Sequence, residues 1–225
     1  MELKYFRVYL QKPKFLSMKK FALVIFTVLL MADLAAARKF RFGFEAGLDI
    51  SKPSNCDGTA CLAYNYGLLG EYDFKSSMKG AYIILKLDVA AKHWNHTVMK
   101  GSYKGKLIAH PVYLQMPIMV GWRVPVSDKI SLKFEAGPYF AQGYLGASKV
   151  NYYNGHSKPY TEDVKDCFGE NGICKRFDTG ISLGVGFSVG KYWQFGVNTA
   201  IQLNKFDQVN NRSNRTYGLS AGLLF

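Results

Sequence analysis

The chain has 225 residues, a formal net charge of +13, 22 glycines and an aromatic content of 15%. This length allows one or two domains. Basic chains are often nucleic-acid-binding proteins, but the export signal described next argues against a nucleic-acid partner.

The first 37 residues have the features of an export signal. Met18-Lys-Lys precedes an apolar run over residues 21–31, and three alanines follow at 35–37. These are the charged, apolar and small-residue parts of a secretory signal peptide. The apolar run has about half of the ~20 residues that a membrane-spanning helix needs. The sequence therefore predicts a cleaved signal over residues 1–37, with Met18 as a candidate true start, and a barrel domain over residues 38–225.

Eight stretches of the mature chain alternate large apolar residues with polar residues or glycine. A period of two is typical of β-strands, and an apolar outer face with a polar inner face is typical of a barrel in lipid. Each stretch is near or above the ~9–11 residues of a tilted membrane strand. The predicted strands are Phe40–Ile50, Tyr64–Phe74, Ala81–Lys92, Ile108–Val124, Ile130–Leu145, Phe177–Val189, Trp193–Leu203 and Arg215–Phe225.

The connections between these stretches are alternately long and short. Outer-membrane barrels have short periplasmic turns and longer extracellular loops. The last stretch ends on Phe225, and an apolar edge strand needs a partner because its unpaired backbone groups promote aggregation. We therefore predict an all-β fold, an eight-stranded antiparallel up-and-down transmembrane β-barrel in which the last strand pairs with the first. Pro117 and Pro138 fall inside strands and are candidate bulges, since proline cannot donate to the ladder.

The four cysteines form two close pairs, Cys56 with Cys61 and Cys167 with Cys174. Disulfides are the leading interpretation in an exported protein. Four cysteines allow three connectivities, of which we expect the two local pairs, in the first and third long loops. A zinc site is the alternative, but the spacings match no usual metal motif and lack histidine partners. We therefore expect no metal ion and no cofactor.

Charged residues of both signs occupy inward-facing positions. The interior of an eight-stranded barrel is just wide enough for side chains to fill. We therefore expect a polar network whose charged side chains pair with one another in salt bridges, with a narrow ion path as the alternative. The expected members of this network are Arg41, Glu45, Glu71, Lys86, Arg123, Lys133 and Glu135.

Several short motifs resemble the outer-membrane β-barrel domain proteins common in Bacteroidetes, often called PorT-like or porin-family proteins. The resemblance covers most of the mature chain. It implies a barrel in the outer membrane of a Gram-negative cell, and it brings no catalytic residues. The motifs are YLQMPI at 113–118, VGWR at 120–123, LKFEAGPY at 132–139, GVGF at 184–187 and GLSAGLLF at 218–225.

The second and third long loops combine lysines with aromatic residues. Such loops suit phosphorylated lipid A or an acidic polysaccharide. We therefore expect a monomeric, non-enzymatic protein with a structural or surface-interaction role. Its expected partners are outer-membrane lipid, lipopolysaccharide, an acidic glycan or another envelope protein. The candidate ligand-binding residues are Lys100, Lys104, Lys106, Lys149 and Lys158.

Other functions stay open at this point. The loops can be solvated without a ligand, and the barrel can be a narrow pore or part of a secretion system. A lipid A-modifying enzyme would need a histidine near the outer rim. The candidates are His110, His156 with Ser157, and the pair His93 and His96, none of which lies in a recognisable motif. A soluble lipocalin-like binder would need apolar residues on the inner face, which is polar.

Overall fold

The computed structural model describes residues 39–54, 59–75, 79–100, 103–154, 157–164, 166–168, 173–204 and 213–225. The expected signal peptide at 1–37 lies outside these ranges. Among the described residues there is no helix with the length and hydropathy needed to cross a membrane.

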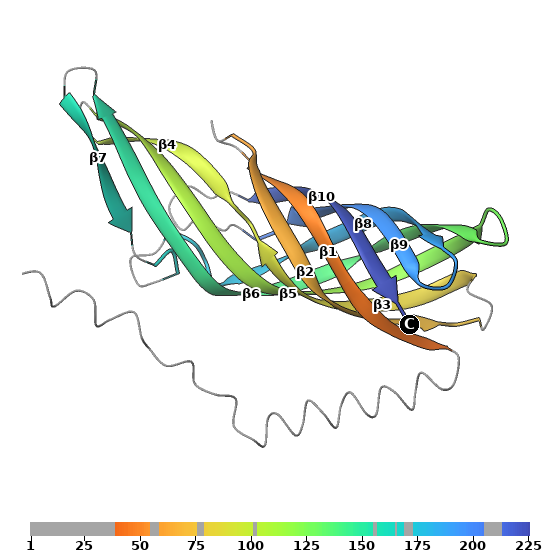
Figure 1. Cartoon of the computed structure of the whole chain (residues 1–225). Helices are drawn as coiled ribbons and strands as arrows, with labels where there is room; N and C mark the ends of the chain where they lie inside the picture. Colours follow the sequence, from red (N-terminus) through yellow and green to blue (C-terminus); the bar gives the residue numbers. More distant parts are fainter. Residues whose placement is uncertain are drawn as a thin grey trace, which may run out of the picture.

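One antiparallel sheet contains every strand of the described residues (Figure 1). Eight strands form a closed ring in the order β1-β2-β3-β5-β6-β8-β9-β10, because β5 also pairs with β6 and β10 pairs with β1. The predicted eight-stranded antiparallel barrel is therefore confirmed. The strands are β1 (Phe40–Pro53), β2 (Cys61–Asp73), β3 (Gly80–Ala91), β4 (Trp94–Lys100), β5 (Tyr103–Pro125), β6 (Ile130–Asn154), β7 (Ser157–Val164), β8 (Phe177–Val189), β9 (Trp193–Gln202) and β10 (Asn214–Leu224).

The side chains of the ring strands alternate as the sequence pattern predicts. On β10, Tyr217 and Leu219 are exposed on the outside, whereas Thr216 and Ser220 are buried inside. The other ring strands repeat this arrangement, so the large apolar side chains cover the outer surface. An apolar outer wall around a polar interior is the arrangement that lipid requires.

Paired residues follow an oblique path around the barrel. The row that leaves β1 at Ile50 returns to the same strand at Phe40 instead of at its starting residue. Between them it passes through Tyr217, Thr199, Leu183, Ala136, Val120, Ile83 and Tyr72. This stagger accompanies the strand tilt of ~35–45° that closes a barrel. A single row thus runs from one end of β1 to the other.

At one end of the barrel, β5 and β6 continue beyond the ring and are joined by β4 and β7 (Figure 1). We call this four-stranded extension the projecting sheet: β4, residues 103–111 of β5, residues 146–154 of β6, and β7. The short connections after β5 and β8 lie at the opposite end. Because short turns of outer-membrane barrels are periplasmic, the projecting sheet is extracellular.

The projecting sheet corrects two predictions. Residues 93–107 and 146–176 were expected to be loops, but most of their described residues are strands. Outside the lipid, nothing requires a large apolar residue on the outer face, so the sequence alternation weakens although the ladder continues. The buried side of this sheet still includes Ala109, Val150 and Tyr152.

The strand prolines are not bulges. The β5–β6 register has its shift between Val112 and Tyr113, and Pro117 keeps its place in the ladder. Pro138 is likewise in register with β8. Each proline removes one donor, but the ladder pairs on both sides hold the strands in position.

Candidate functional site

Glu71 on β2 is the centre of an ion-pair network in the lumen. Its side chain is fully buried and contacts Arg41, Arg123 and Lys133, the last with 3.2 Å between Nζ and Oε2. Asp73 shares the two arginines, at 3.3 Å from Arg41 and 2.8 Å from Arg123. Three cations therefore share two carboxylates in a space closed to solvent, and these contacts compensate the cost of burying the charges.

The network continues towards the middle of the barrel. Lys133 Nζ lies 2.9 Å from Glu135 Oε1, and the hydroxyl of Tyr82 donates to the same oxygen at 2.8 Å. Lys86 Nζ lies 2.7 Å from Glu45 Oε1. The structure thus places all seven expected lumen residues inside the barrel and in ion pairs. Sequence reasoning left Asp73 and Tyr82 out of the set, although alternation alone puts both on the inner face.

Little space remains between these side chains. Two cavities of about 50 and 30 Å³ lie beside Glu45 and Lys86. A single water molecule needs about 10–15 Å³ measured in this way, so each cavity has room for only a few waters. Asp49 and Gln115 line the larger cavity, and each has one buried oxygen without a hydrogen-bond partner among the described residues. Ordered water is the natural partner for such atoms.

A third group of charges lies nearer the extracellular end. Lys92 Nζ is 2.5 Å from Asp178 Oδ2. The same ammonium lies 4.5 Å from the ring centroid of Tyr139, whose hydroxyl donates to Asp178 Oδ1 at 3.2 Å. The ring of Tyr113 is also near, with its centroid 5.2 Å from Lys92 Nζ. This pair was not predicted, because Lys92 follows β3 directly, Asp178 is on β8, and the two residues are 86 positions apart.

The described residues of the connection between β7 and β8 pack at the extracellular end of the barrel. Cys167, Phe168 and Cys174 are buried in an apolar cluster with residues of β4, β5 and β6 that include Trp94 and Tyr113. We call residues 167–168 and 173–174 the plug. Its backbone is fixed by the amide of Cys167, which donates to the carbonyl of Gly146 at 3.2 Å. A Cβ atom on Gly146 would lie only 2.1 Å from Cys167 Sγ, so this close approach requires glycine.

The two plug cysteines lie side by side as thiols. The Cys174 amide donates to the Cys167 carbonyl at 2.7 Å. The hydrogen bond with the Cys174 side chain holds the pKa of the Cys167 thiol below its ordinary value. The disulfide between them stays a prediction. Of the other expected pair, Cys56 lies outside the described residues, and Cys61 Sγ accepts a hydrogen bond from Asn95 at 3.1 Å.

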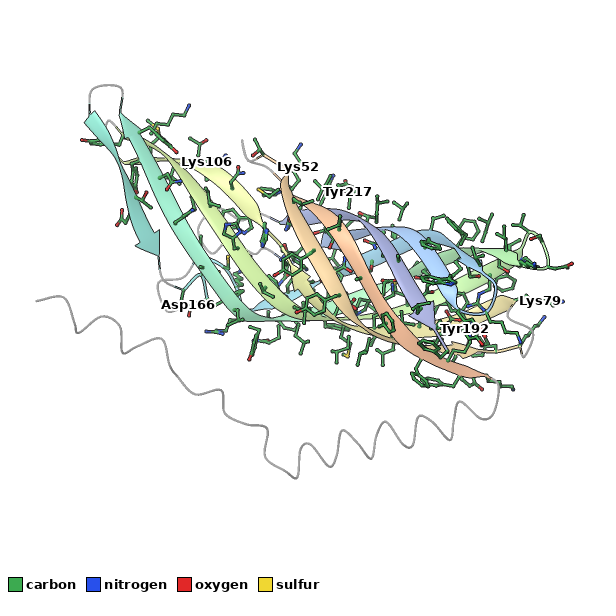
Figure 2. The ribbon with its side chains drawn as sticks, in the orientation of Figure 1. Lys52, Lys79, Lys106, Asp166, Tyr192 and Tyr217 are labelled. Atoms are coloured by element: carbon green, nitrogen blue, oxygen red, sulfur yellow. The ribbon has the colours of Figure 1, made fainter. Side chains whose placement is uncertain are left out.

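Two of the candidate lysines share one face of the projecting sheet. Lys104 and Lys106 alternate with buried Gly105 on β5, so both point outwards and both are exposed. Lys149 on β6 pairs with Ile108 and is exposed on the same face. Asp163 on β7 is the ladder partner of Lys149, so the charge of Lys149 has an acidic neighbour in the register. Figure 2 shows Lys106 on the projecting sheet and Lys79 at the opposite end of the barrel.

The remaining candidate lysines are less well described. Lys100 is the last residue of β4 and Lys158 is in β7. The side chains of both lie outside the described part of the structure. The five candidates therefore belong to strands of one sheet, whereas they were expected in two loops.

Two of the candidate histidines contact each other. The rings of His93 and His110 meet edge to face, with their centroids 4.5 Å apart. His93 Nδ1 also lies 2.9 Å from the carbonyl oxygen of Leu62. Burial and the nearby His93 and Lys149 lower the pKa of His110. His96 is in β4, and His156 lies outside the described residues. The described residues contain no group of three or more His, Cys, Asp or Glu side chains placed to hold a metal ion.

Comparison with known proteins identifies one family and several similar structures. The family described as "Outer membrane protein beta-barrel domain" matches residues 21–225. The outer membrane protein OprG of Pseudomonas aeruginosa is 13% identical, with 83% of this chain and 95% of that chain covered and a TM-score of 0.47. Neisserial surface protein A is 12% identical, with 82% and 95% covered and a TM-score of 0.40. The attachment invasion locus protein Ail of Yersinia pestis is 13% identical, with 83% and 99% covered and a TM-score of 0.39. A search of curated proteins finds no significant match.

Proposed function

The chain belongs to the outer membrane protein β-barrel domain family and sits in the outer membrane, and on that premise we propose that it binds an acidic glycan at the cell surface. The projecting sheet supplies the binding surface. The barrel is a closed anchor that holds this sheet away from the membrane.

The placement of Lys104 and Lys106 carries this proposal. Both are exposed on one face of β5, and neither has a carboxylate partner among the described residues. Lys106 lies six residues beyond Val112, with His110 and Ile108 at the outward positions between them. At ~3.3 Å per residue this is about 20 Å of strand. Tyr153, the ladder partner of Lys104, is exposed beside it and offers a ring that can pack against sugar.

The packed lumen favours a role of the barrel as an anchor and not as a narrow pore. The Glu71 network fills the periplasmic half, and the cavities near Glu45 have room for only a few waters. The plug packs against Tyr113 and Tyr139 beside the Lys92–Asp178 pair. An ion path would have to displace both groups of side chains.

A polyanion-binding experiment tests the proposal. Dextran sulfate is the probe, uncharged dextran is the control ligand, and affinity is measured in detergent at several salt concentrations. Two exposed charges at about 0.5–1 kcal/mol each correspond to a loss of roughly five- to thirtyfold in affinity for the double variant Lys104→Gln/Lys106→Gln. Binding should also weaken as salt rises. The control is Lys79→Gln/Lys129→Gln, which removes the same charge at the periplasmic end. Equal binding by the two double variants would refute the proposal.

We further propose that the protein is monomeric and not an enzyme. In support, the described contacts of His93 and His110 are with each other, with Tyr64 and with the carbonyl of Leu62. No described serine or carboxylate holds either ring. Incubation with lipid A followed by mass spectrometry should return the lipid unchanged. Loss or gain of an acyl chain would contradict this expectation.

The motifs at 113–123 and 132–139 lie on β5 and β6, which pair with each other. This pairing supports membership of the PorT-like group, and a phylogeny of the family would test it. We propose cleavage after Ala37, so the amino-terminal sequence of the protein from outer membranes should begin at Arg38. An uncleaved N-terminus would overturn that prediction.

A further inference from the structure

The outward apolar series of β1 and β10 both end in a cation at the extracellular end. Lys52 follows Ile50 on β1, and Arg215 precedes Tyr217 on β10. Lys52 and Arg215 are ladder partners, and both are exposed. Below them the outward positions are Phe42, Phe44, Ala46, Leu48 and Ile50 on β1, and Tyr217, Leu219, Ala221, Leu223 and Phe225 on β10.

Two like charges directly opposite one another destabilise a β-ladder. The described residues provide neither Lys52 nor Arg215 with a carboxylate in an ion pair. The pair lies one outward step beyond Ile50 and Tyr217, whose side chains are still half exposed at the lipid-facing surface. Figure 2 shows Lys52 and Tyr217 towards the extracellular end. A cation one step beyond the apolar band of a membrane barrel is placed at the lipid–water interface, so the two cations suit an anionic headgroup.

A groove on the outside of the barrel begins at the same place. It has a volume of about 710 Å³, and its lining is almost entirely apolar. It starts at Tyr217 and follows the oblique row of paired residues down the wall. Thr199 and Ala136 are its small residues, and larger side chains such as Trp122 and Phe134 rise beside them. Because the row descends from the extracellular end of β10 towards the periplasmic part of β5, the groove runs into the membrane.

We propose that Lys52, Arg215 and this groove form a binding site for a phosphorylated glycolipid of the outer leaflet, namely lipopolysaccharide. A phosphate between the two side chains would neutralise both cations, and the guanidinium of Arg215 can donate two parallel hydrogen bonds to it. One acyl chain would then lie in the groove from Tyr217 towards Ala136. This inference goes beyond the proposed glycan binding, because it uses a different surface and different residues.

The phosphate half of the site is tested with the intact protein in detergent. The probe is deep-rough lipopolysaccharide, and the bound fraction is counted by native mass spectrometry. Lys52→Gln/Arg215→Gln should weaken binding by at least about tenfold, since hydrogen bonds to charged groups contribute about 1.5–3 kcal/mol each. Dephosphorylated lipopolysaccharide should bind the unchanged protein as weakly as intact lipopolysaccharide binds the variant. The matched control, Lys39→Gln/Lys191→Gln, removes equal charge at the periplasmic end and should leave binding unchanged.

The acyl half is tested without any change of charge. Ala136→Phe fills the groove with an apolar side chain on the lipid-facing surface and should reduce the affinity for lipopolysaccharide several-fold. Ala46→Phe makes the same change on β1, outside the groove, and should have no effect. Heat-modifiable gel mobility verifies that each variant is folded.

Four results would overturn the proposal. The first is that Lys52→Gln/Arg215→Gln binds lipopolysaccharide as tightly as its control variant does, and the second is that dephosphorylated lipopolysaccharide binds the unchanged protein as tightly as intact lipopolysaccharide does. The third is that Ala136→Phe and Ala46→Phe bind lipopolysaccharide equally. The fourth is that phosphatidylglycerol binds the protein as tightly as lipopolysaccharide does. The last would assign the site to an ordinary phospholipid. The dextran sulfate measurement separates this site from the projecting sheet. Lys52→Gln/Arg215→Gln should bind dextran sulfate as the unchanged protein does, and Lys104→Gln/Lys106→Gln should bind lipopolysaccharide as the unchanged protein does.

Discussion

The ring of Phe168 meets the ring of Tyr113 edge to face, with 5.4 Å between their centroids and an interplanar angle of 85°. Phe168 comes from the connection after β7, whereas Tyr113 points into the lumen from β5. Edge-to-face pairs contribute about 0.5–1.5 kcal/mol beyond the burial of their area. The connection after β7 is thus held by a side chain that points into the lumen.

Phe168→Ala should release the plug without unfolding the barrel. The substitution removes a buried aromatic side chain from the apolar cluster, while the ring of strands keeps its ladder. The exposed Lys175 and Arg176 follow the plug directly, so trypsin should cut after them much faster in the variant. Fragment masses after limited proteolysis give the measurement. Phe177→Ala is the control, because Phe177 faces outwards with 55% of its area exposed. If both variants were cut at the same rate, Phe168 would not hold the plug.

Glu71→Gln should destabilise the barrel strongly. The amide keeps the shape of the side chain but leaves Arg41, Arg123 and Lys133 with one buried negative charge fewer. Breaking a buried ion pair by removing one partner costs about 3–5 kcal/mol. Urea unfolding in lipid vesicles, followed by tryptophan fluorescence, measures the change. Asp128→Asn removes the same charge from an exposed turn and should cost less than about 0.5 kcal/mol. A loss below about 1 kcal/mol for Glu71→Gln would contradict this prediction.

Cys167 and Cys174 should form a disulfide under oxidising conditions. They are adjacent and buried in the plug, and the lowered pKa of Cys167 favours the reactive thiolate. A bridge that closes so short a loop should stabilise the plug by about 2–3 kcal/mol in the chain-entropy account. Peptide mapping without reduction should find this pair and the pair Cys56–Cys61. Two free thiols in the plug after oxidation, or a bridge from the first loop to the plug, would disprove the assignment.

Gly218→Ala should impair closure of the barrel. Gly218 on β10 pairs with Asp49 on β1, and a Cβ at this position would lie 1.9 Å from Asp49 Oδ1 and 2.6 Å from Asn198 Oδ1. The folded fraction on heat-modifiable gels should therefore fall. Gly196→Ala is the matched control, since its nearest atom would be Ser220 Oγ at an ordinary 3.4 Å. The additional changes Asp49→Gly and Asn198→Gly should restore folding of Gly218→Ala. If they do not, these two contacts are not the cause.

The wall of the barrel could be predicted from the sequence because strand geometry fixes a period of two. The outward Tyr217 on β10 was found in this way, and the bounds of β8 were predicted to the residue. The partners inside the barrel could not be predicted in the same way. Lys133 and Glu71 are 62 positions apart, and their contact depends on the register across β3 and β5. Alternation predicts on which face of the strand a side chain lies, but not which residues it contacts.

The projecting sheet and the plug were missed for a different reason. Lys104 and Lys106 alternate with Gly105 and Leu107, a pattern that occurs equally in loops, and only the pairing with β4 and β6 makes it a strand. Phe168 is a single apolar residue in a polar stretch. Its burial depends on the space beside Tyr113, which exists only once the barrel has closed.

The pairing of β1 with β10 has a consequence for biogenesis. Every other junction of the ring joins neighbours in the order of synthesis, whereas this one joins the first strand of the barrel to the last. Until residues 214–224 are in place, β1 and β9 each keep an open edge, and an unpaired backbone group costs several kcal/mol in hydrocarbon. A chain that lacks β10 would therefore have no stable smaller structure in the bilayer. Insertion must be an all-or-none event, and the two open edges need shelter from other proteins until the last strand arrives.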